Sequence, residues 1–320
     1  MNVADIRKIA IIGAGVMGPG IAEVFAIFGA HDDYEISLYD ISSDALKSAD
    51  RKIRSDLEKV ASTGLYSEED LKKAKQRITL EQDLTNAVST TQLVIEAVPE
   101  KMELKMKIFK DLDRLAPPTA ILATNSSGLS VTEIASVIKR PELCIGTHFM
   151  NPPLMMPLVE IVKGEKTGPE TVQVINELLA GVGKKPVIIK KDVEGYVHNR
   201  MQAALFREAM YLLDNDVISV EDLETTIQYG LGLRLPVMKV FEMVDLMGID
   251  TIKNVLTYLY PKLSRSIEPP GILDGMIKEG NLGLKSGKGF HDYSQRNIQE
   301  AMNQREAATF QLLMLLRQFE

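Results

Sequence analysis

Residues 8–26 read KIAIIGAGVMGPGIAEVFA and predict a strand, a glycine-rich turn and a helix in that order. The apolar run at 8–12 suits a buried strand, and GAGVMG at 13–18 has the spacing Gly-x-Gly-x-x-Gly. A turn of this kind follows the first strand of doubly wound α/β domains, where the start of the helix receives the pyrophosphate of a dinucleotide. The stretch therefore predicts an α/β fold with a dinucleotide site at its first turn.

The three glycines of this turn have separate predicted roles. Gly13 permits the tight turn, Gly15 lets the backbone approach the pyrophosphate, and Gly18 lets the helix pack on the strand. Val16 and Met17 lie between the last two glycines and complete the predicted cofactor contacts of the turn. The same fingerprint also serves FAD, but a two-domain chain of this size favours a soluble dehydrogenase.

A carboxylate ends the second predicted strand. Residues 35–40 read EISLYD, and Asp40 follows Gly18 by about 20 residues, as in dinucleotide-binding domains. We expect Asp40 to accept hydrogen bonds from both ribose hydroxyls and to repel a 2′-phosphate. The residues at 41–43, Ile-Ser-Ser, offer no arginine that could hold such a phosphate. The sequence therefore predicts NAD as the cofactor in preference to NADP.

Chain length and periodicity predict two domains. The 320 residues exceed an average single domain. Short apolar runs alternate with helical patterns up to about residue 190, and helical periodicity takes over afterwards. We therefore expect a Rossmann-type doubly wound sheet over 1–190 and an all-α domain for substrate binding and dimerisation over 191–320. The expected strands cover 8–12, 35–39, 92–96, 120–124, 143–149, 157–162 and 186–190.

Two segments depart from the simple alternation of strands and helices. Residues 43–78 are charged and amphipathic, with a break at Thr63-Gly64 and a helix-starting cluster at 67–70, and they predict a helical hairpin inserted into the first domain. The last segment, from about Ser294, is expected to form a helix with one apolar stripe that packs either on its own domain or at a subunit interface. The stripe consists of Ala308, Leu312, Leu315, Leu316 and Phe319.

Composition and charge exclude several classes of function. With 45% hydrophobic and 25% charged residues, the chain is typical of a soluble globular protein, and no apolar run approaches the ~20 residues of a membrane helix. A formal charge of −7 argues against nucleic-acid binding. The four histidines, at 31, 148, 198 and 291, have no metal-ligand spacing, so no metal is expected. One cysteine, Cys144, and a start without an apolar leader predict a reducing, cytoplasmic setting.

A histidine and a glutamate form the predicted catalytic pair. His148 ends the apolar run 143–147, so we expect it at a strand end, where doubly wound folds bind their ligands. Oxidation of an alcohol needs a base for the hydroxyl proton, and histidine suits that task near neutral pH. Glu160 lies inside the apolar strand 158–162 and needs a partner there. Pairing with His148 would fix the imidazole tautomer and stabilise the imidazolium.

Together these segments resemble the L-3-hydroxyacyl-CoA dehydrogenase family over nearly the whole chain. The resemblance implies an NAD-dependent oxidoreductase of fatty-acid β-oxidation that acts on a small-molecule substrate as a homodimer. It rests on the glycine turn and on further motifs in the same order, which read VIEAVPE at 94–100, TNSS at 124–127, HFMNP at 148–152, LVE at 158–160, GYVHNR at 195–200 and GLKSGKGF at 283–290.

The resemblance assigns roles to individual residues. It implies that His148 is the acid/base, that Glu160 is its partner, and that Ser127 contacts both the cofactor and the substrate oxygen. Asn199 is implied as a further catalytic-site residue that reaches the substrate. The remaining implied positions lie on the cofactor side and are Glu100, Lys105, Asn151 and Lys285.

The sequence of the helical hairpin does not decide which substrate the protein uses. Family members that act on CoA esters carry basic residues near the hairpin turn, where they can meet the CoA phosphates. Here residues 60–66 read VASTGLY, so Lys52, Arg54 or Lys59 would have to replace them. The retained hairpin nevertheless favours a short-chain L-3-hydroxyacyl-CoA, such as 3-hydroxybutyryl-CoA, as the expected substrate.

Three other features lean toward relatives that oxidise free 3-hydroxy acids. They are Ser127-Gly128 in place of two serines, the doubled Pro152-Pro153, and the helix after Tyr293. The first alternative substrate is therefore a free acid of the kind used by carnitine, gulonate or pyridine-carboxylate dehydrogenases. The second alternative is a non-catalytic, crystallin-like protein that binds NAD.

Overall fold

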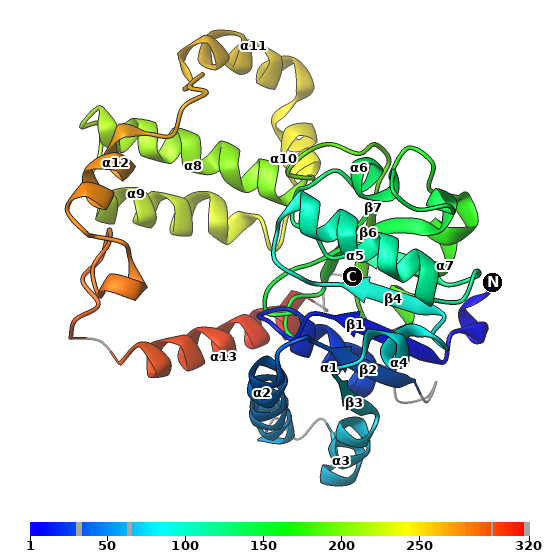
Figure 1. The fold of residues 1–320 in the computed structure, drawn as a ribbon. Coiled ribbons are helices and arrows are strands. Elements are labelled where there is room, and N and C mark those ends of the chain that lie inside the picture. The colour runs from blue at the N-terminus through cyan, green and yellow to red at the C-terminus, as the bar shows by residue number, and fades with distance from the viewer. Residues whose placement is uncertain (30–33, 63–65, 296, 317–320) are drawn as a thin grey trace. The chain divides into compact units, whose positions relative to one another are not determined.

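The structure is a computed structural model that describes residues 1–29, 34–62, 66–295 and 297–316. The chain divides into two compact units, Met1–Asn199 and Arg200–Glu320. The first unit is a sheet flanked by helices, and the second consists of helices joined by loops (Figure 1). Within the described parts of the chain, no helix is both long and apolar enough to cross a membrane.

The first unit is built on one sheet of eight strands in the order β3-β2-β1-β4-β5-β6-β7-β8. All neighbouring strands are parallel except β6 and β7, which are antiparallel. The expected α/β fold with a helical second part is confirmed. The strands are β1 (Lys8–Ile12), β2 (Glu35–Tyr39), β3 (Ile78–Glu81), β4 (Leu93–Glu96), β5 (Ile121–Thr124), β6 (Cys144–Phe149), β7 (Leu158–Val162) and β8 (Lys185–Ile189).

Side chains of β1 alternate between two hydrophobic clusters on opposite faces of the sheet. Ile9 and Ile11 pack with α1 and α7, whereas Ala10 and Ile12 pack with α5 and α6. A sheet that is covered on both faces explains why its strands read as continuous apolar runs. The helices of this unit are α1 (Gly18–Phe28), α2 (Ser43–Ser62), α3 (Glu68–Gln76), α4 (Leu84–Val88), α5 (Met102–Leu115), α6 (Val131–Ala135) and α7 (Pro169–Gly181).

The hairpin region differs from the expectation at its end. Helices α2 and α3 form as predicted, and the Ser67 side chain caps α3 by accepting a hydrogen bond from the Asp70 amide at 3.1 Å. The expected helical pattern to residue 78 was wrong at its last position, because Ile78 starts β3, an edge strand that the sequence analysis did not predict. Only Ile78 of this short strand is buried, so its apolar signal is weak. The predicted break at Thr63-Gly64 lies outside the described residues.

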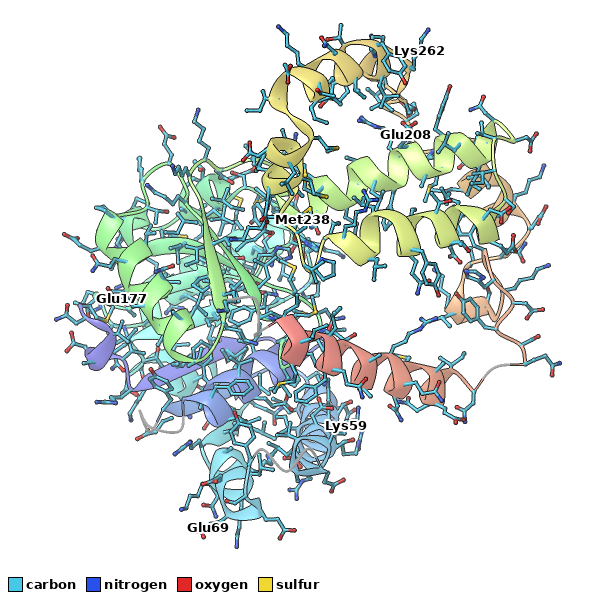
Figure 2. All side chains as sticks on the ribbon, turned by 180° about the vertical axis from the view of Figure 1, so that it is seen from behind. Lys59, Glu69, Glu177, Glu208, Met238 and Lys262 are labelled. Carbon is cyan, nitrogen blue, oxygen red and sulfur yellow. The ribbon has the colours of Figure 1, made fainter. Side chains whose placement is uncertain are left out.

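The second unit is helical, as expected. Apart from Leu223 and Ser264, the residues that the structure describes in this unit are at least partly exposed. Side chains in this unit, such as that of Lys262, extend into solvent (Figure 2). The elements are α8 (His198–Asp214, which begins in the first unit), α9 (Val220–Thr226), a π-helical turn (Ile227–Gly232), α10 (Val240–Met247), α11 (Ile249–Leu259), α12 (Gly271–Lys278) and α13 (Ile298–Leu316).

The predicted stripe on the last helix remains partly open to solvent in a single chain. Leu312 and Leu315 of α13 are 41% and 44% exposed, so α13 does not bury these side chains against its own unit. Phe319 lies outside the described residues. Of the two expected environments for the stripe, packing on its own domain is therefore not observed for these leucines.

A buried carboxyl group lies under the hairpin. Glu23 of α1 is 0% exposed, and neither of its oxygens has a hydrogen-bond partner among the described residues. Burial, and then the nearby Asp56 carboxylate, raise the pKa of Glu23 to about 8 against the opposing effect of Lys52, Lys59 and Lys75. Glu23 therefore takes up a proton on folding at neutral pH.

We expect Glu23→Gln to stabilise the protein, and more so as the pH rises. Between the ordinary glutamate pKa and about 8, the unfolded chain is ionised and the folded chain is protonated, so the free energy of unfolding falls with increasing pH. Glutamine removes this cost, which is on the order of 3 kcal/mol at pH 7. The gap in Tm between the variant and the wild type should widen from pH 5 to pH 8. The exposed Glu58→Gln on α2 is the control, and an equal gap at both pH values would contradict the prediction.

Candidate functional site

The glycine turn has the geometry that its sequence predicts. Gly13 has a φ of 113°, and a Cβ at Gly13 would lie 2.7 Å from the carbonyl oxygen of Ala97. A Cβ at Gly18 would lie 1.8 Å from the carbonyl oxygen of Gly13. At Gly15 a Cβ would meet no described atom within 4 Å. The first and third glycines are therefore required by the fold, whereas Gly15 faces open space that a ligand can enter.

The variants Gly15→Ala and Gly18→Ala should separate cofactor binding from folding. We expect Gly15→Ala to keep the wild-type Tm and to bind NADH about tenfold more weakly, because its methyl group occupies the space predicted for the pyrophosphate. Gly18→Ala should lower the Tm, because its methyl group meets backbone atoms. Thermal unfolding and NADH fluorescence titration measure the two effects. Unchanged NADH affinity in Gly15→Ala would count against a pyrophosphate at this turn.

Asp40 lies beside the turn, directly after β2. Its Oδ2 accepts a hydrogen bond from the Ala14 amide at 2.8 Å, and its Oδ1 accepts one from the Ser42 amide at 2.8 Å. Each carboxylate oxygen retains a second acceptor site, so the group can still receive ribose hydroxyls. Val16 of the turn is 72% exposed. These positions suit the predicted NAD contacts, which remain a prediction.

His148 and Glu160 face each other across the antiparallel pair of β6 and β7, where they are direct partners in the register. The distance from His148 Nδ1 to Glu160 Oε2 is 2.8 Å, and the two residues are 5% and 1% exposed. The other oxygen, Glu160 Oε1, accepts hydrogen bonds from the backbone amides of Val197 at 3.1 Å and His198 at 2.8 Å. The buried carboxylate thus has partners at both oxygens.

Glu160 is ionised at neutral pH. Burial acts to raise its pKa, but the hydrogen bonds from His148 and from the His198 amide outweigh burial and hold the pKa below its ordinary value. An ionised Glu160 favours the His148 tautomer that carries hydrogen on Nδ1, which leaves Nε2 as an acceptor. The Tyr196 ring packs edge-on against the imidazole, with ring centroids 5.6 Å apart. The arrangement can therefore take up a proton at Nε2.

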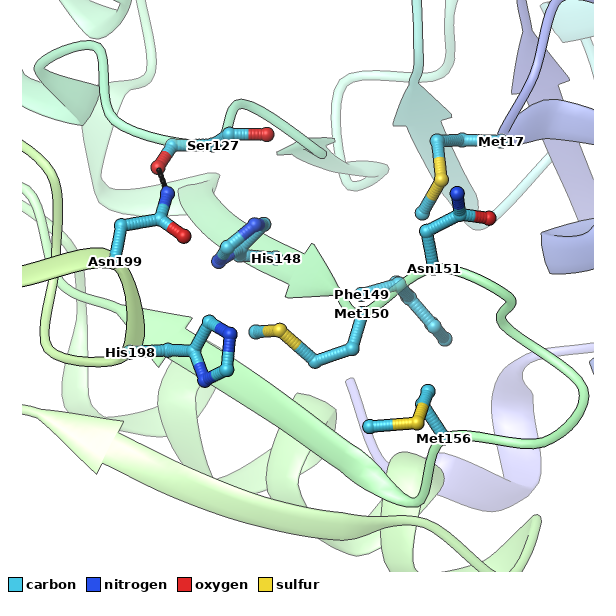
Figure 3. A pocket seen from close by; sticks show the side chains of 9 residues that line it. All are labelled: Met17, Ser127, His148, Phe149, Met150, Asn151, Met156, His198 and Asn199. Carbon is cyan, nitrogen blue, oxygen red and sulfur yellow. Dashed lines mark hydrogen bonds between the residues drawn. The ribbon is translucent and has the colours of Figure 1, made fainter. Parts of the chain in front are cut away.

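A pocket in the first unit brings together most of the predicted active-site residues (Figure 3). It contains His148, Ser127 and Asn199, and the Asn199 side-chain amide donates a hydrogen bond to the Ser127 carbonyl oxygen at 2.7 Å. Its other predicted members are Met17 and Asn151, and it also contains four residues that the sequence analysis did not predict as site residues, Phe149, Met150, Met156 and His198.

The loop that carries Ser127 is held by Glu100. Glu100 Oε1 accepts hydrogen bonds from the Ser126 hydroxyl at 2.5 Å, the Ser127 amide at 2.8 Å and the Gly128 amide at 3.2 Å. Burial acts to raise the pKa of Glu100. The Ser126 hydroxyl and the Lys105 ammonium lower this pKa by more than burial raises it, so the pKa lies below its ordinary value. Glu100 is therefore ionised, and its carboxylate positions Ser127 at the pocket.

A fully buried ion pair supports the same loop. Lys105 Nζ lies 2.8 Å and 3.0 Å from the two oxygens of Glu96 and 3.3 Å from Glu100 Oε2, and the Thr124 hydroxyl donates to Glu96 at 2.7 Å. Lys105 and Glu96 are 1% and 0% exposed. The expected place of Lys105 on the cofactor side stays a prediction. Because Lys105 is buried, we expect it to act on the cofactor site through Glu100. Glu96 was missed, although a glutamate inside an apolar strand is the signal that identified Glu160.

A second lysine holds the loop between β6 and β7. Lys184 Nζ donates hydrogen bonds to the carbonyl oxygens of Pro153 at 2.5 Å and Met156 at 3.2 Å. Burial lowers the pKa of Lys184 to about 8. This loop carries Asn151 and Met156 into the pocket, so Lys184 positions one of the pocket walls.

Two predictions concern features outside this pocket. Lys285 belongs to the second unit, where it is exposed on the short helix Leu284–Ser286, and its cofactor contact stays a prediction. Among the residues that the structure describes, no three His, Cys, Asp or Glu side chains group as metal ligands.

Comparison with known proteins matches both parts of the chain to one family. The model described as "3-hydroxyacyl-CoA dehydrogenase, NAD binding domain" covers residues 8–193, and that of its C-terminal domain covers 195–293. The 5-formyl-3-hydroxy-2-methylpyridine 4-carboxylate 5-dehydrogenase of Mesorhizobium japonicum is 36% identical over 90% of this chain and 91% of that protein. A probable 3-hydroxybutyryl-CoA dehydrogenase of Bacillus subtilis is 36% identical over 91% of this chain and 99% of that protein.

A solved structure extends the likeness to the whole chain. The crystal structure of a 5-formyl-3-hydroxy-2-methylpyridine 4-carboxylic acid 5-dehydrogenase, described as an NAD⁺-dependent dismutase, superposes with a TM-score of 0.86 and 32% identity. It covers 98% of this chain and 100% of that chain. The predicted NAD cofactor and oxidoreductase class are confirmed by these matches.

Proposed function

Because the chain belongs to the 3-hydroxyacyl-CoA dehydrogenase family, we propose that it oxidises the 3-hydroxyl group of a short-chain L-3-hydroxyacyl-CoA to the 3-oxoacyl-CoA. The observation that carries the proposal is the buried hydrogen bond between His148 and Glu160, with His148 opening into the pocket. Such a pair provides a base of fixed tautomer for a substrate hydroxyl.

The first unit fits NAD at the glycine turn. Gly15 leaves room for the pyrophosphate, and Asp40 offers acceptors for the ribose hydroxyls. Bound NAD supplies the acceptor for the hydride that leaves C3 of the substrate. Met17 lies both in the turn and in the pocket wall, so the cofactor site and the pocket that holds His148 are continuous.

His148 and its neighbours carry the proton chemistry in this proposal. Neutral His148 accepts the 3-hydroxyl proton at Nε2, and ionised Glu160 stabilises the imidazolium that results. The Ser127 hydroxyl and the Asn151 amide lie in the same pocket and donate toward the substrate oxygen where negative charge develops. In the reverse direction, the imidazolium returns the proton to the alkoxide.

The experiment follows NADH oxidation at 340 nm with acetoacetyl-CoA and, in parallel, with a panel of free 3-oxo acids. The proposal predicts turnover with acetoacetyl-CoA. Turnover with a free acid and none with the CoA ester would replace the substrate and retain the mechanism. Activity with neither class would contradict the proposed function.

A free 3-hydroxy acid or a pyridine carboxylate is the second candidate substrate. The observation in its favour is structural similarity, because the pyridine-carboxylate enzyme superposes with a TM-score of 0.86, whereas the solved 3-hydroxybutyryl-CoA dehydrogenases of Escherichia coli and Ralstonia eutropha give 0.76 and 0.75. Against it stand the family models described for 3-hydroxyacyl-CoA dehydrogenase, which match residues 8–193 and 195–293. The substrate panel separates the two candidates.

We also propose that the protein is a homodimer through its helical unit. Large apolar side chains on this unit are open in the single chain, including Phe241 at 80%, Leu246 at 70% and Tyr258 at 67% exposure. Apolar surface of this kind is commonly covered by a partner. Light scattering should give twice the chain mass of 35.5 kDa, and a monomeric mass would contradict the proposal.

The unpaired, buried Cys144 supports the proposal that the protein works in a reducing, cytoplasmic compartment.

A further inference from the structure

The pocket contains a second histidine that the proposed reaction does not use. The ring of His198 lies in the pocket wall near His148 and Met150 (Figure 3). Within the described parts of the chain, the His198 ring makes no hydrogen bond, although its backbone amide does. A partly exposed imidazole without a protein partner is a free hydrogen-bonding group inside the site.

Glu160 ties both histidines to one carboxylate. Its Oε2 binds the ring of His148, and its Oε1 accepts from the backbone amide of His198. The backbone reaches this position through Gly195 and Tyr196, whose φ angles of 76° and 50° are both positive. Tyr196 is non-glycine and fully buried, and its hydroxyl donates to the Leu129 carbonyl oxygen at 2.8 Å, which holds the turn in this conformation. The position of His198 relative to His148 is therefore built into the fold.

The other polar groups of the pocket are partly committed. The Asn199 amide donates to the Ser127 carbonyl oxygen, and His148 Nδ1 is engaged by Glu160. The lining residues include no lysine or arginine. Among the lining residues that the structure describes, the His198 ring is thus the one group other than His148 that can carry a positive charge toward a second substrate oxygen.

A 3-hydroxy acyl substrate brings such an oxygen. It has one oxygen at C3, where the reaction occurs, and another at C1, two carbons away. We propose that the His198 ring binds the C1 oxygen while His148 acts at C3, an inference that rests on the proposed function. The C1 oxygen is the thioester carbonyl of an acyl-CoA or the carboxylate of a free acid, and both accept a hydrogen bond from an imidazole N–H. His198 is then a residue that selects 3-oxygenated acyl compounds over simple alcohols.

The test compares His198→Leu, which removes the donor, with His198→Gln, which keeps an N–H donor. With acetoacetyl-CoA and acetoacetate as probes, we expect His198→Leu to lower kcat/KM about tenfold if the bound oxygen is a thioester carbonyl and about a hundredfold if it is a carboxylate. The change should fall mainly on KM, and His198→Gln should recover most of it. The dissociation constant of NADH, measured by fluorescence, should stay within twofold and shows that each variant is folded.

His148→Ala, measured beside these variants, separates this inference from the proposed function. If His148→Ala abolishes turnover and His198→Leu leaves kcat/KM within twofold for every active substrate, the role of His198 is wrong and the proposed function stands. If His198→Leu lowers kcat/KM as expected and His148→Ala retains turnover, the acid/base assignment fails while His198 remains a substrate contact. A loss that His198→Gln does not recover would also contradict hydrogen bonding by His198.

Discussion

His148→Ala is expected to lower kcat by about 10²- to 10⁴-fold while NADH binding stays close to that of the wild type. The imidazole is the base of the proposed reaction. Ser127 and Asn151 cannot accept the hydroxyl proton, and the second imidazole of the pocket, that of His198, is assigned to the C1 oxygen and not to the reacting hydroxyl. Stopped-flow or steady-state measurement of NADH oxidation, together with an NADH titration, gives both quantities. A fall in kcat of less than about tenfold would show that another group is the base.

Glu160→Gln should lower kcat by a similar factor. A neutral amide stabilises the imidazolium less, and its NH₂ group can donate to Nδ1 and so favour the wrong tautomer. Because the pKa of Glu160 lies below its ordinary value, the stabilisation by its charge is present at neutral pH and is lost only as the pH falls through that lowered pKa. The exposed Glu165→Gln, just beyond β7, is the matched control. Equal activity of the two variants would contradict the role of Glu160.

Lys105→Met is expected to have the largest effect on stability. It leaves Glu96, which is 0% exposed, as an uncompensated buried charge, and breaking one side of a buried pair costs about 3–5 kcal/mol. For a unit of this size that corresponds to a fall in Tm of roughly 10 °C. The exposed Lys107→Met on the same helix is the matched control. A Tm within about 2 °C of the wild type would show that the pair contributes little.

The double variant Lys105→Met/Glu96→Leu tests the cause of this loss. Removing both charges eliminates the unpaired carboxylate, so much of the lost stability should return. The Thr124 hydroxyl then lacks its acceptor, and Glu100 loses a neighbouring cation, so the loop at Ser127 should still be less well held. We therefore expect a recovered Tm together with a lowered kcat. If the Tm does not recover in the double variant, Lys105→Met destabilises the protein by disrupting packing and not by leaving a buried charge unpaired.

The parts of the fold that follow a strong local pattern could be predicted from the sequence. The strand, turn and helix at 8–26 are present as expected. Gly13 and Gly18 are required there because a side chain would meet backbone atoms, and Gly15 leaves space that a ligand can enter. The edge strand β3 could not, since one buried residue in four carries almost no periodic signal. The antiparallel direction of β7 could have been predicted, because the connection from β6 is shorter than the dozen residues that a parallel crossover needs.

The candidate site shows the same division. His148 and Glu160 stood out because a polar residue in an apolar strand needs a partner, and the structure places them 2.8 Å apart. The same signal marked Glu96, which was not pursued. His198 carried no such signal, since a histidine at the start of a helix is ordinary in sequence, and its place in the pocket depends on a turn at Tyr196 with positive φ. Such long-range placement is set by tertiary contacts.

The antiparallel pairing of β6 with β7 separates the proton-transfer pair from one wall of the pocket. His148 and Glu160 are held by the ladder itself, whereas the connection between these strands, residues 150–157, carries Met150, Asn151 and Met156 into the pocket. Changes of residue in that connection leave the register of the ladder intact. Proteins that descend from one ancestral gene can thus keep the same proton-transfer pair and change their substrate by altering a single loop. Transplanting this loop between relatives is a direct route to exchanging their substrates.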